Sequence, residues 1–148
     1  MARTTLHVDH SPAEVFAVLS DPWRFADWVV GAKKIRAVDG NWPEIGSRFH
    51  HRFGVGPLTI DDSTVLEEYH PDRKMVLRAR ARPTGVARVI LELVPGAGGG
   101  TEIHMEEFPI SGFAKKIDNP VLEAMVVARN RRSLRRLGDL AARAGSPA

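Results

Sequence analysis

Hydrophobic and polar residues alternate with a period of two along most of the chain, which is the pattern of β-strands with one buried face. Several of these segments carry apolar residues on one side and charged residues on the other, and segments rich in glycine and proline, such as PTG and PGAGGG, separate them as turns. The expected strands lie at residues 3–11, 33–38, 47–53, 58–69, 74–82, 87–94 and 101–108. One-sided strands predict an antiparallel sheet that is covered on one face only.

Two short helices are predicted directly after the first strand. The first begins with Ser11 as N-cap, Pro12 at the first helical position and Glu14 at the capping-box position. The second begins at Pro22 and is expected to end at Gly31, because glycine commonly follows the last residue of a helix.

A long helix is predicted at the C-terminal end of the chain. Asp118 or Asn119 can cap it, Pro120 lies in its first turn, and the helical period continues for more than 20 residues. Its apolar stripe consists of Leu122, Met125, Val126, Leu134, Leu137 and Leu140. We therefore expect an α+β protein in which this helix covers the sheet.

The order of these elements, together with four sequence segments, resembles the START-related (SRPBCC) superfamily, which includes the polyketide cyclase/dehydrase-like proteins. The segments are HVDHSPAEVFAVLSDPWRFADW, GSRF, EYHPDRKMVLR and GGGTEIHMEEF, followed by the long helix. The resemblance implies a helix-grip fold, in which a curved antiparallel sheet of about seven strands wraps round the long C-terminal helix. It also implies a cavity between sheet and helix that takes an apolar small molecule.

Length and composition fit this expectation. The chain has 148 residues, of which 43% are hydrophobic and 26% charged, and we expect one domain over residues 1–144 with a flexible tail at 145–148. There is no cysteine, which excludes a disulfide framework and a cysteine nucleophile. No signal-peptide pattern or apolar run of membrane-spanning length is present, so we expect a cytoplasmic protein without integral membrane association.

Polar residues that share the apolar phase of a strand are the candidates for chemistry. His51 stands between Phe49 and Phe53 at spacing two, so its imidazole should face the helix. Asp62 and Thr64 fall on the inward phase of the next strand. An imidazole can act as acid or base near neutral pH, which makes His51 the leading catalytic candidate.

Two charged residues belong to the same set. Glu107 continues the inward phase of the last strand, and Arg129 interrupts the apolar stripe of the long helix near its middle. An unpaired buried charge is costly, so inward charges imply a partner, water or a ligand. We expect Asp62 and Glu107 to hold His51 or Arg129, although a bulge in the strand would turn Asp61 inward in place of Asp62.

Aromatic residues concentrate in the second short helix, where Trp23, Phe25 and Trp28 are expected to close one end of the cavity. Alanines 79, 81 and 87 on inward phases leave space beside the long helix. The expected ligand-lining residues are Trp28, Phe49, His51, Phe53, Asp62, Thr64, Leu77, Ala79, Leu91, Met105, Glu107, Phe113, Leu122, Met125, Val126 and Arg129.

Three functions remain open. We favour binding of a hydrophobic or amphipathic, lipid- or polyketide-like molecule between sheet and helix, because the inward phases are mostly apolar. The alternative is a cyclase or dehydratase in which His51 is the base and Arg129 binds a carbonyl oxygen. A third is an interaction module that works through its arginine-rich faces.

Two such faces are visible in the sequence. One lies on the long helix (Arg132, Arg135, Arg136 and Arg143, diluted by Asp139), and the other on a strand (Arg78, Arg80 and Arg82). We interpret both as solvated, with an acidic protein or an anionic membrane surface as the alternative partner. Nucleic acid is not expected, since no aromatic residues are interleaved there.

Other chemistry has little support in the sequence. The glycine cluster joins two strands as a turn and lacks the residues of a phosphate loop, and the histidines have no ligand spacing. We therefore expect no metal and no cofactor. An exposed strand edge or the loop between Phe108 and Phe113 could pair two chains into a homodimer.

Overall fold

The computed structural model describes residues 2–81, 85–112 and 119–144. Its centre is one antiparallel sheet of seven strands in the order β1-β7-β6-β5-β4-β3-β2, so that β1 and β2 form the two edges. The strands are β1 (Ala2–Val8), β2 (Ala32–Asp39), β3 (Arg48–Val55), β4 (Leu58–His70), β5 (Lys74–Ala81), β6 (Gly85–Pro95) and β7 (Thr101–Ser111).

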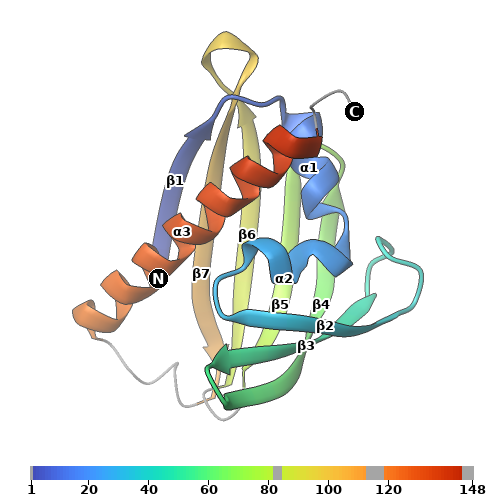
Figure 1. Ribbon diagram of the computed structural model, residues 1–148, viewed down its shortest axis with the longest axis vertical. Coiled ribbons are helices and arrows are strands. Elements are labelled where there is room, and N and C mark those ends of the chain that lie inside the picture. The colour runs from blue at the N-terminus through green and yellow to red at the C-terminus, as the bar shows by residue number, and fades with distance from the viewer. Residues whose placement is uncertain (1, 82–84, 113–118, 145–148) are drawn as a thin grey trace.

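The sheet is strongly curved. Figure 1 shows β2 and β3 crossing at a steep angle to β1, β6 and β7. Irregularities in the pairing of β2 with β3 and of β4 with β5 accompany this bend, as expected because a bulge adds a residue to one strand and increases its twist.

The segment after β1 carries the chain from one edge of the sheet to the other. It comprises α1 (Pro12–Leu19), the 3₁₀ turn η1 (Pro22–Arg24) and α2 (Phe25–Trp28); a further 3₁₀ turn, η2 (Ala97–Gly99), lies between β6 and β7. The predicted capping box is present, because the Ser11 hydroxyl accepts from the Glu14 amide while the Ser11 amide donates to the Glu14 carboxylate, both at 3.2 Å.

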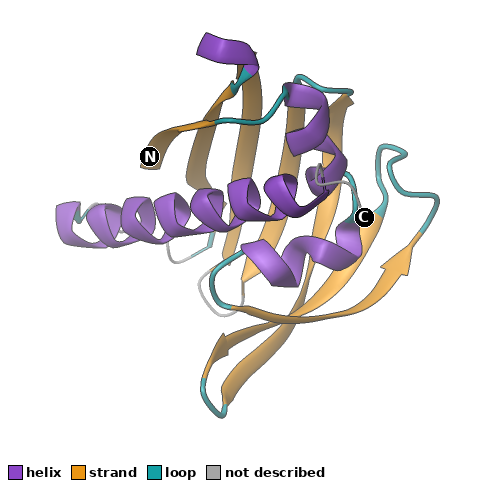
Figure 2. Cartoon of the chain, turned by 45° about the horizontal axis from the view of Figure 1, so that its top comes forward, coloured by secondary structure: helices purple, strands orange, loops and turns teal. Residues whose placement is uncertain are grey.

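The long helix α3 (Pro120–Ala144) lies on the same side of the sheet as α1 and α2 (Figure 2). It packs along β1, α1 and α2. Gly138 allows the close approach to β1, since a Cβ atom there would lie 2.9 Å from Cγ1 of Val8. Leu134 and Leu137, both fully buried, join the residues of α1 and the inner face of the sheet in one core.

The architecture confirms the fold expected from the sequence. All seven strands, the two short helices after β1 and the C-terminal helix occur in the predicted order. Among the described residues, no helix is long and apolar enough to cross a membrane.

Candidate functional site

Strand register places the inner face of the sheet in rows that run from strand to strand. Directly opposed residues of neighbouring strands share a face. One row joins Leu66, Leu77, Val89 and Glu107. A second row, displaced along the strands, joins Phe49, Thr64, Ala79 and Ala87. Contacts with the helices identify this face as the covered one, since Glu107 meets α3 and Phe49 stacks on Phe25 of α2.

Small side chains occupy the centre of the second row, and solvent reaches them. Ala79 and Ala87 project only a methyl group each, and both are partly exposed to solvent. The first two turns of α3 do not cover this region, since Leu122 is exposed and Val126 is only half-buried. The same stripe of α3 is buried further along, from Asn130 onward, so the helix closes tightly over one part of the sheet and leaves the other accessible.

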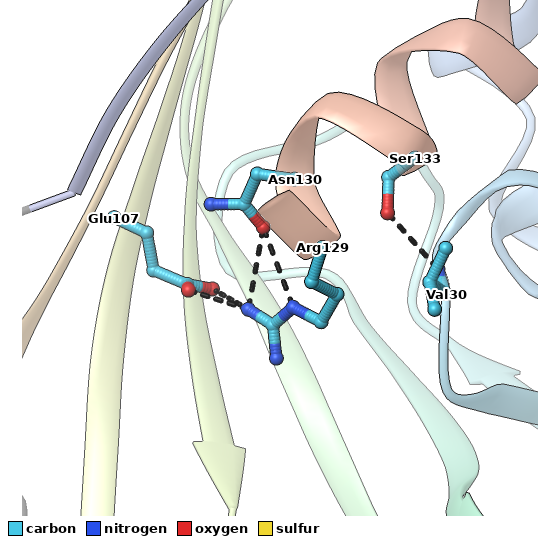
Figure 3. A network of polar contacts seen from close by, with 5 residues as sticks. All are labelled: Val30, Glu107, Arg129, Asn130 and Ser133. Carbon is cyan, nitrogen blue, oxygen red and sulfur yellow. Dashed lines mark hydrogen bonds and ion pairs between the residues drawn. The ribbon is translucent and has the colours of Figure 1, made fainter. Parts of the chain in front are cut away.

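A polar cluster borders this open region on the β7 side (Figure 3). Nη2 of Arg129 donates to the Glu107 carboxylate, with 2.8 Å to Oε1, and the Asn130 side-chain oxygen accepts from the same guanidinium at 3.3 to 3.4 Å. The arginine side chain is 33% exposed and the glutamate 17%. Glu107 thus neutralises Arg129 at a place that solvent still reaches.

His51 borders the region on the β3 side. Its ring lies between those of Phe49 and Phe53, and Nε2 forms a hydrogen bond of 3.1 Å with the Thr64 hydroxyl. Burial lowers the pKa of the imidazole below its usual value, and the negative charge of Asp62 only partly opposes this effect. His51 is therefore neutral at pH 7.

The Asp62 side chain is buried and Asp61 is partly exposed on the other side of the strand, as the inward phase predicts. The Asp62 carboxylate pairs with Arg80 and also accepts from the Ser63 amide. Arg52 and Arg36 pair with Asp61, and the hydrogen bond from Arg52 lowers the pKa of that carboxyl.

An aromatic cluster closes the end of the sheet beneath α2. Phe25 packs against Trp28, Trp42 and Phe49 with ring centroids 4.6 to 6.3 Å apart. Trp23 does not take part, because it is 56% exposed; the expectation that all three residues of this segment close the cavity is wrong for Trp23. It stands in η1, where solvent reaches its side chain.

Trp42 takes the place that the sequence suggested for Trp23. Its Nε1 donates to the carbonyl oxygen of Ser20 at 3.0 Å. Trp42 lies in the connection between β2 and β3, which has no periodic pattern, so only its aromatic character could have drawn attention to it.

Two buried donors, Trp28 Nε1 on α2 and Asn130 Nδ2 on α3, have no acceptor within the described residues. A hydrogen bond of 3.0 Å from the Val30 amide to the Ser133 hydroxyl, one helical turn beyond Asn130, joins the segment after α2 to α3 (Figure 3). His51 Nδ1 is likewise buried without a hydrogen bond in this part of the chain. The sequence signal for Asn130 and Ser133 is that both are polar residues within the otherwise apolar stripe of the long helix.

His51 and Arg129 have different partners. His51 lies on β3 and bonds Thr64, whereas Arg129 bonds Glu107 on β7 and its neighbour Asn130. Four steps in the strand order separate β3 from β7.

The remaining predicted residues fall into three groups. Leu77, Leu91 and Met105 are buried on the inner face. Leu122 and Met125 are exposed on α3, because its first turns do not reach the sheet. Phe113 lies outside the described residues, as do Arg82 and the tail 145–148.

Two shallow surface hollows are present elsewhere. One, of about 270 Å³, is lined by residues near the β4–β5 turn, including His70 and Arg73, and the other, of about 330 Å³, by residues of the β2–β3 connection, including Asn41 and Glu44. Neither lies between sheet and α3. In the described part of the chain, no three potential ligands among histidine and carboxylate side chains are grouped for a metal ion.

Comparison with solved structures defines the class of protein. The chain is similar to Ara h 8.0201 (TM-score 0.74, 13% identity, 95% of this chain and 96% of that chain). It is also similar to a protein of Nitrosomonas europaea (TM-score 0.72, 17% identity, 95% and 93%) and to one of Thermus thermophilus (TM-score 0.72, 11% identity, 98% and 99%). At these identities the likeness shows the fold alone, which is the helix-grip fold.

The sequence itself gives the family. Residues 2–142 match the family described as polyketide cyclase / dehydrase and lipid transport, and the chain belongs to this family. A comparison with curated proteins gives no significant match.

Proposed function

We propose that this protein binds a hydrophobic or amphipathic small molecule, lipid- or polyketide-like, on the part of the inner face of the sheet that the first turns of α3 leave uncovered. The observation that carries the proposal is the low, partly exposed floor formed by Ala79 and Ala87 within an otherwise apolar face. The family description, which names polyketide chemistry and lipid transport, supports the same class of ligand.

Apolar contact would supply most of the affinity. Removal of apolar surface from water contributes about 25 cal/mol per Å², so a ligand that covers a few hundred Å² of this floor gains several kcal/mol before the costs of association. The exposed stripe of α3 at Leu122 and Val126 offers the facing wall. Closure of these turns over a ligand would bury both surfaces together.

The polar rim favours a ligand without net charge. Arg129 is neutralised by Glu107, and His51 is neutral at pH 7, so neither border of the floor presents an unbalanced charge. The guanidinium and the buried Asn130 amide can donate hydrogen bonds, which suits a ligand carbonyl or hydroxyl oxygen. We further propose that residues 1–144 act as one ligand-binding domain, since the family match spans 2–142.

Binding is favoured over catalysis because the inner face is mostly apolar and because His51 and Arg129 are each engaged by another residue, Thr64 and Glu107. If the protein nevertheless acts on its ligand, His51 is the candidate base, since its lowered pKa keeps the imidazole unprotonated. His51→Phe then removes turnover and leaves ligand affinity within a few-fold of the wild type.

The test of binding is a titration with the uncharged fluorescent probe N-phenyl-1-naphthylamine, with displacement by uncharged fatty alcohols. Wild-type protein should bind the probe saturably and release it on displacement. Ala87→Phe fills the floor and should weaken binding at least tenfold. Val94→Phe is the matched control, because Val94 is exposed on the outer face of the same strand. Equal binding by all three proteins would reject the proposed site.

A further inference from the structure

The outer face of α3 carries five exposed arginines. They are Arg131, Arg132, Arg135, Arg136 and Arg143, and all are exposed. Within the described residues no ion pair joins any of them to a carboxylate, although Asp139 lies on the same helix. Five cations on one helix face repel one another, so this surface attracts an anionic partner.

The arginines of the sheet behave differently. Glu67 pairs with both Arg78 and Arg88, Asp61 with both Arg36 and Arg52, and Asp62 with Arg80. In the basic row that the sequence places on β5, Arg78 and Arg80 therefore each have a carboxylate partner. The arginines of α3, in contrast, form a cluster of exposed cations without a carboxylate partner among the described residues.

The same face of α3 becomes apolar toward its first turn. Val121 is 67% exposed and Met125 63% exposed. At 100° per residue, both project within about 40° of Arg132 and Arg143, so apolar and cationic residues form one continuous stripe along the outside of the helix. Leu122, which is also exposed, lies beside this stripe.

We propose that this stripe docks on an anionic lipid surface, with the first turns of α3 inserted at the interface and the arginines against the lipid headgroups. An exposed apolar end joined to a cationic face matches a bilayer, which offers both an apolar layer and negative charge. Nucleic acid would use the arginines and leave Val121 and Met125 in water. The inference does not depend on the proposed ligand site, whose floor lies on the inner face of the sheet.

The test is co-sedimentation of the full chain with vesicles of phosphatidylcholine alone or mixed with phosphatidylglycerol in equal parts. Binding should require the anionic lipid and should fall steeply with added salt, because the attraction acts over about one Debye length. Each arginine near such a surface contributes about a fivefold increase in partitioning. Arg132→Gln/Arg136→Gln should therefore weaken binding about 25-fold.

Two matched control variants test whether binding depends on this surface or only on the net charge and apolar content of the protein. Arg78→Gln/Arg88→Gln makes the same change of charge on the sheet and should leave partitioning within about twofold. Val121→Ser/Met125→Ser should weaken binding several-fold, whereas Leu58→Ser, at another exposed apolar position, should not. Equal sedimentation with both kinds of vesicle, or loss of binding in the control variants to the same degree, would overturn the proposal. The proposal would also be overturned if the protein did not bind vesicles but bound an oligonucleotide through Arg132 and Arg136.

Discussion

The ion pair between Glu107 and Arg129 fastens α3 to the sheet beside the proposed ligand floor, and Glu107→Gln tests its contribution to stability. Exposed pairs contribute about 0.2–1 kcal/mol, whereas breaking a fully buried pair costs about 3–5 kcal/mol. With side chains 33% and 17% exposed, this pair lies between those limits. We expect Glu107→Gln to lower the free energy of unfolding by about 1–2 kcal/mol, since Arg129 keeps only its contact with Asn130.

A double-mutant cycle with Arg129→Gln isolates the interaction itself. Because each single change removes the same contact, the two losses should not add, and the coupling energy should be about 1 kcal/mol. Urea unfolding followed by circular dichroism measures all four proteins. The neighbouring pair Arg3–Glu106, which joins β1 to β7, is the control, since its side chains are 72% and 36% exposed and its coupling should be below about 0.5 kcal/mol. Equal coupling energies for the two pairs would refute the reasoning from burial.

Three further changes test other parts of the structure. His51 has a lower pKa in the folded protein than in the unfolded chain, so its contribution to stability is present above about pH 6.5 and is lost as the pH falls toward the lowered value. The free energy of unfolding of the wild type, relative to that of His51→Phe, should therefore decrease as the pH is lowered through that window. A difference that does not change with pH would contradict the burial of the imidazole. Leu134→Ala, at a fully buried position of α3, should cost about 2–5 kcal/mol in chemical denaturation, and a cost below about 1 kcal/mol would show that α3 is not packed as described. Ser11→Ala removes the cap of α1 and should cost about 1 kcal/mol, with Ser11→Thr as the control that retains the hydroxyl.

The elements of the fold could be predicted because each leaves a local signal. Strands with one covered face alternate at every second residue, and the capping box at Ser11 marks the start of α1 directly. The pairing of Glu107 with Arg129 was also accessible, since each is a charged residue in an otherwise apolar stripe and such residues require partners.

What the sequence could not predict depends on the three-dimensional path of the chain. Arg80 alternates with Ala79 along β5, and nothing local indicates that its long side chain pairs with Asp62 on the neighbouring strand. Leu122 and Met125 belong to a helical stripe that is apolar at both ends, but the distance of each turn of α3 from the curved sheet decides which part of the stripe is buried. Tertiary packing also decides that Trp42, and not Trp23, joins the aromatic cluster.

The most direct test of ligand binding on the inner face is methyl NMR during titration with an uncharged fatty alcohol. Alternate residues of one strand lie on opposite faces, so the sheet contains its own control. We predict saturable shifts for the methyl groups of Ala79, Ala87 and Met105, with Ile90 and Val94 on the outer face unchanged. Shifts confined to Ile90 and Val94, or no saturable shift at any methyl group, would contradict the account.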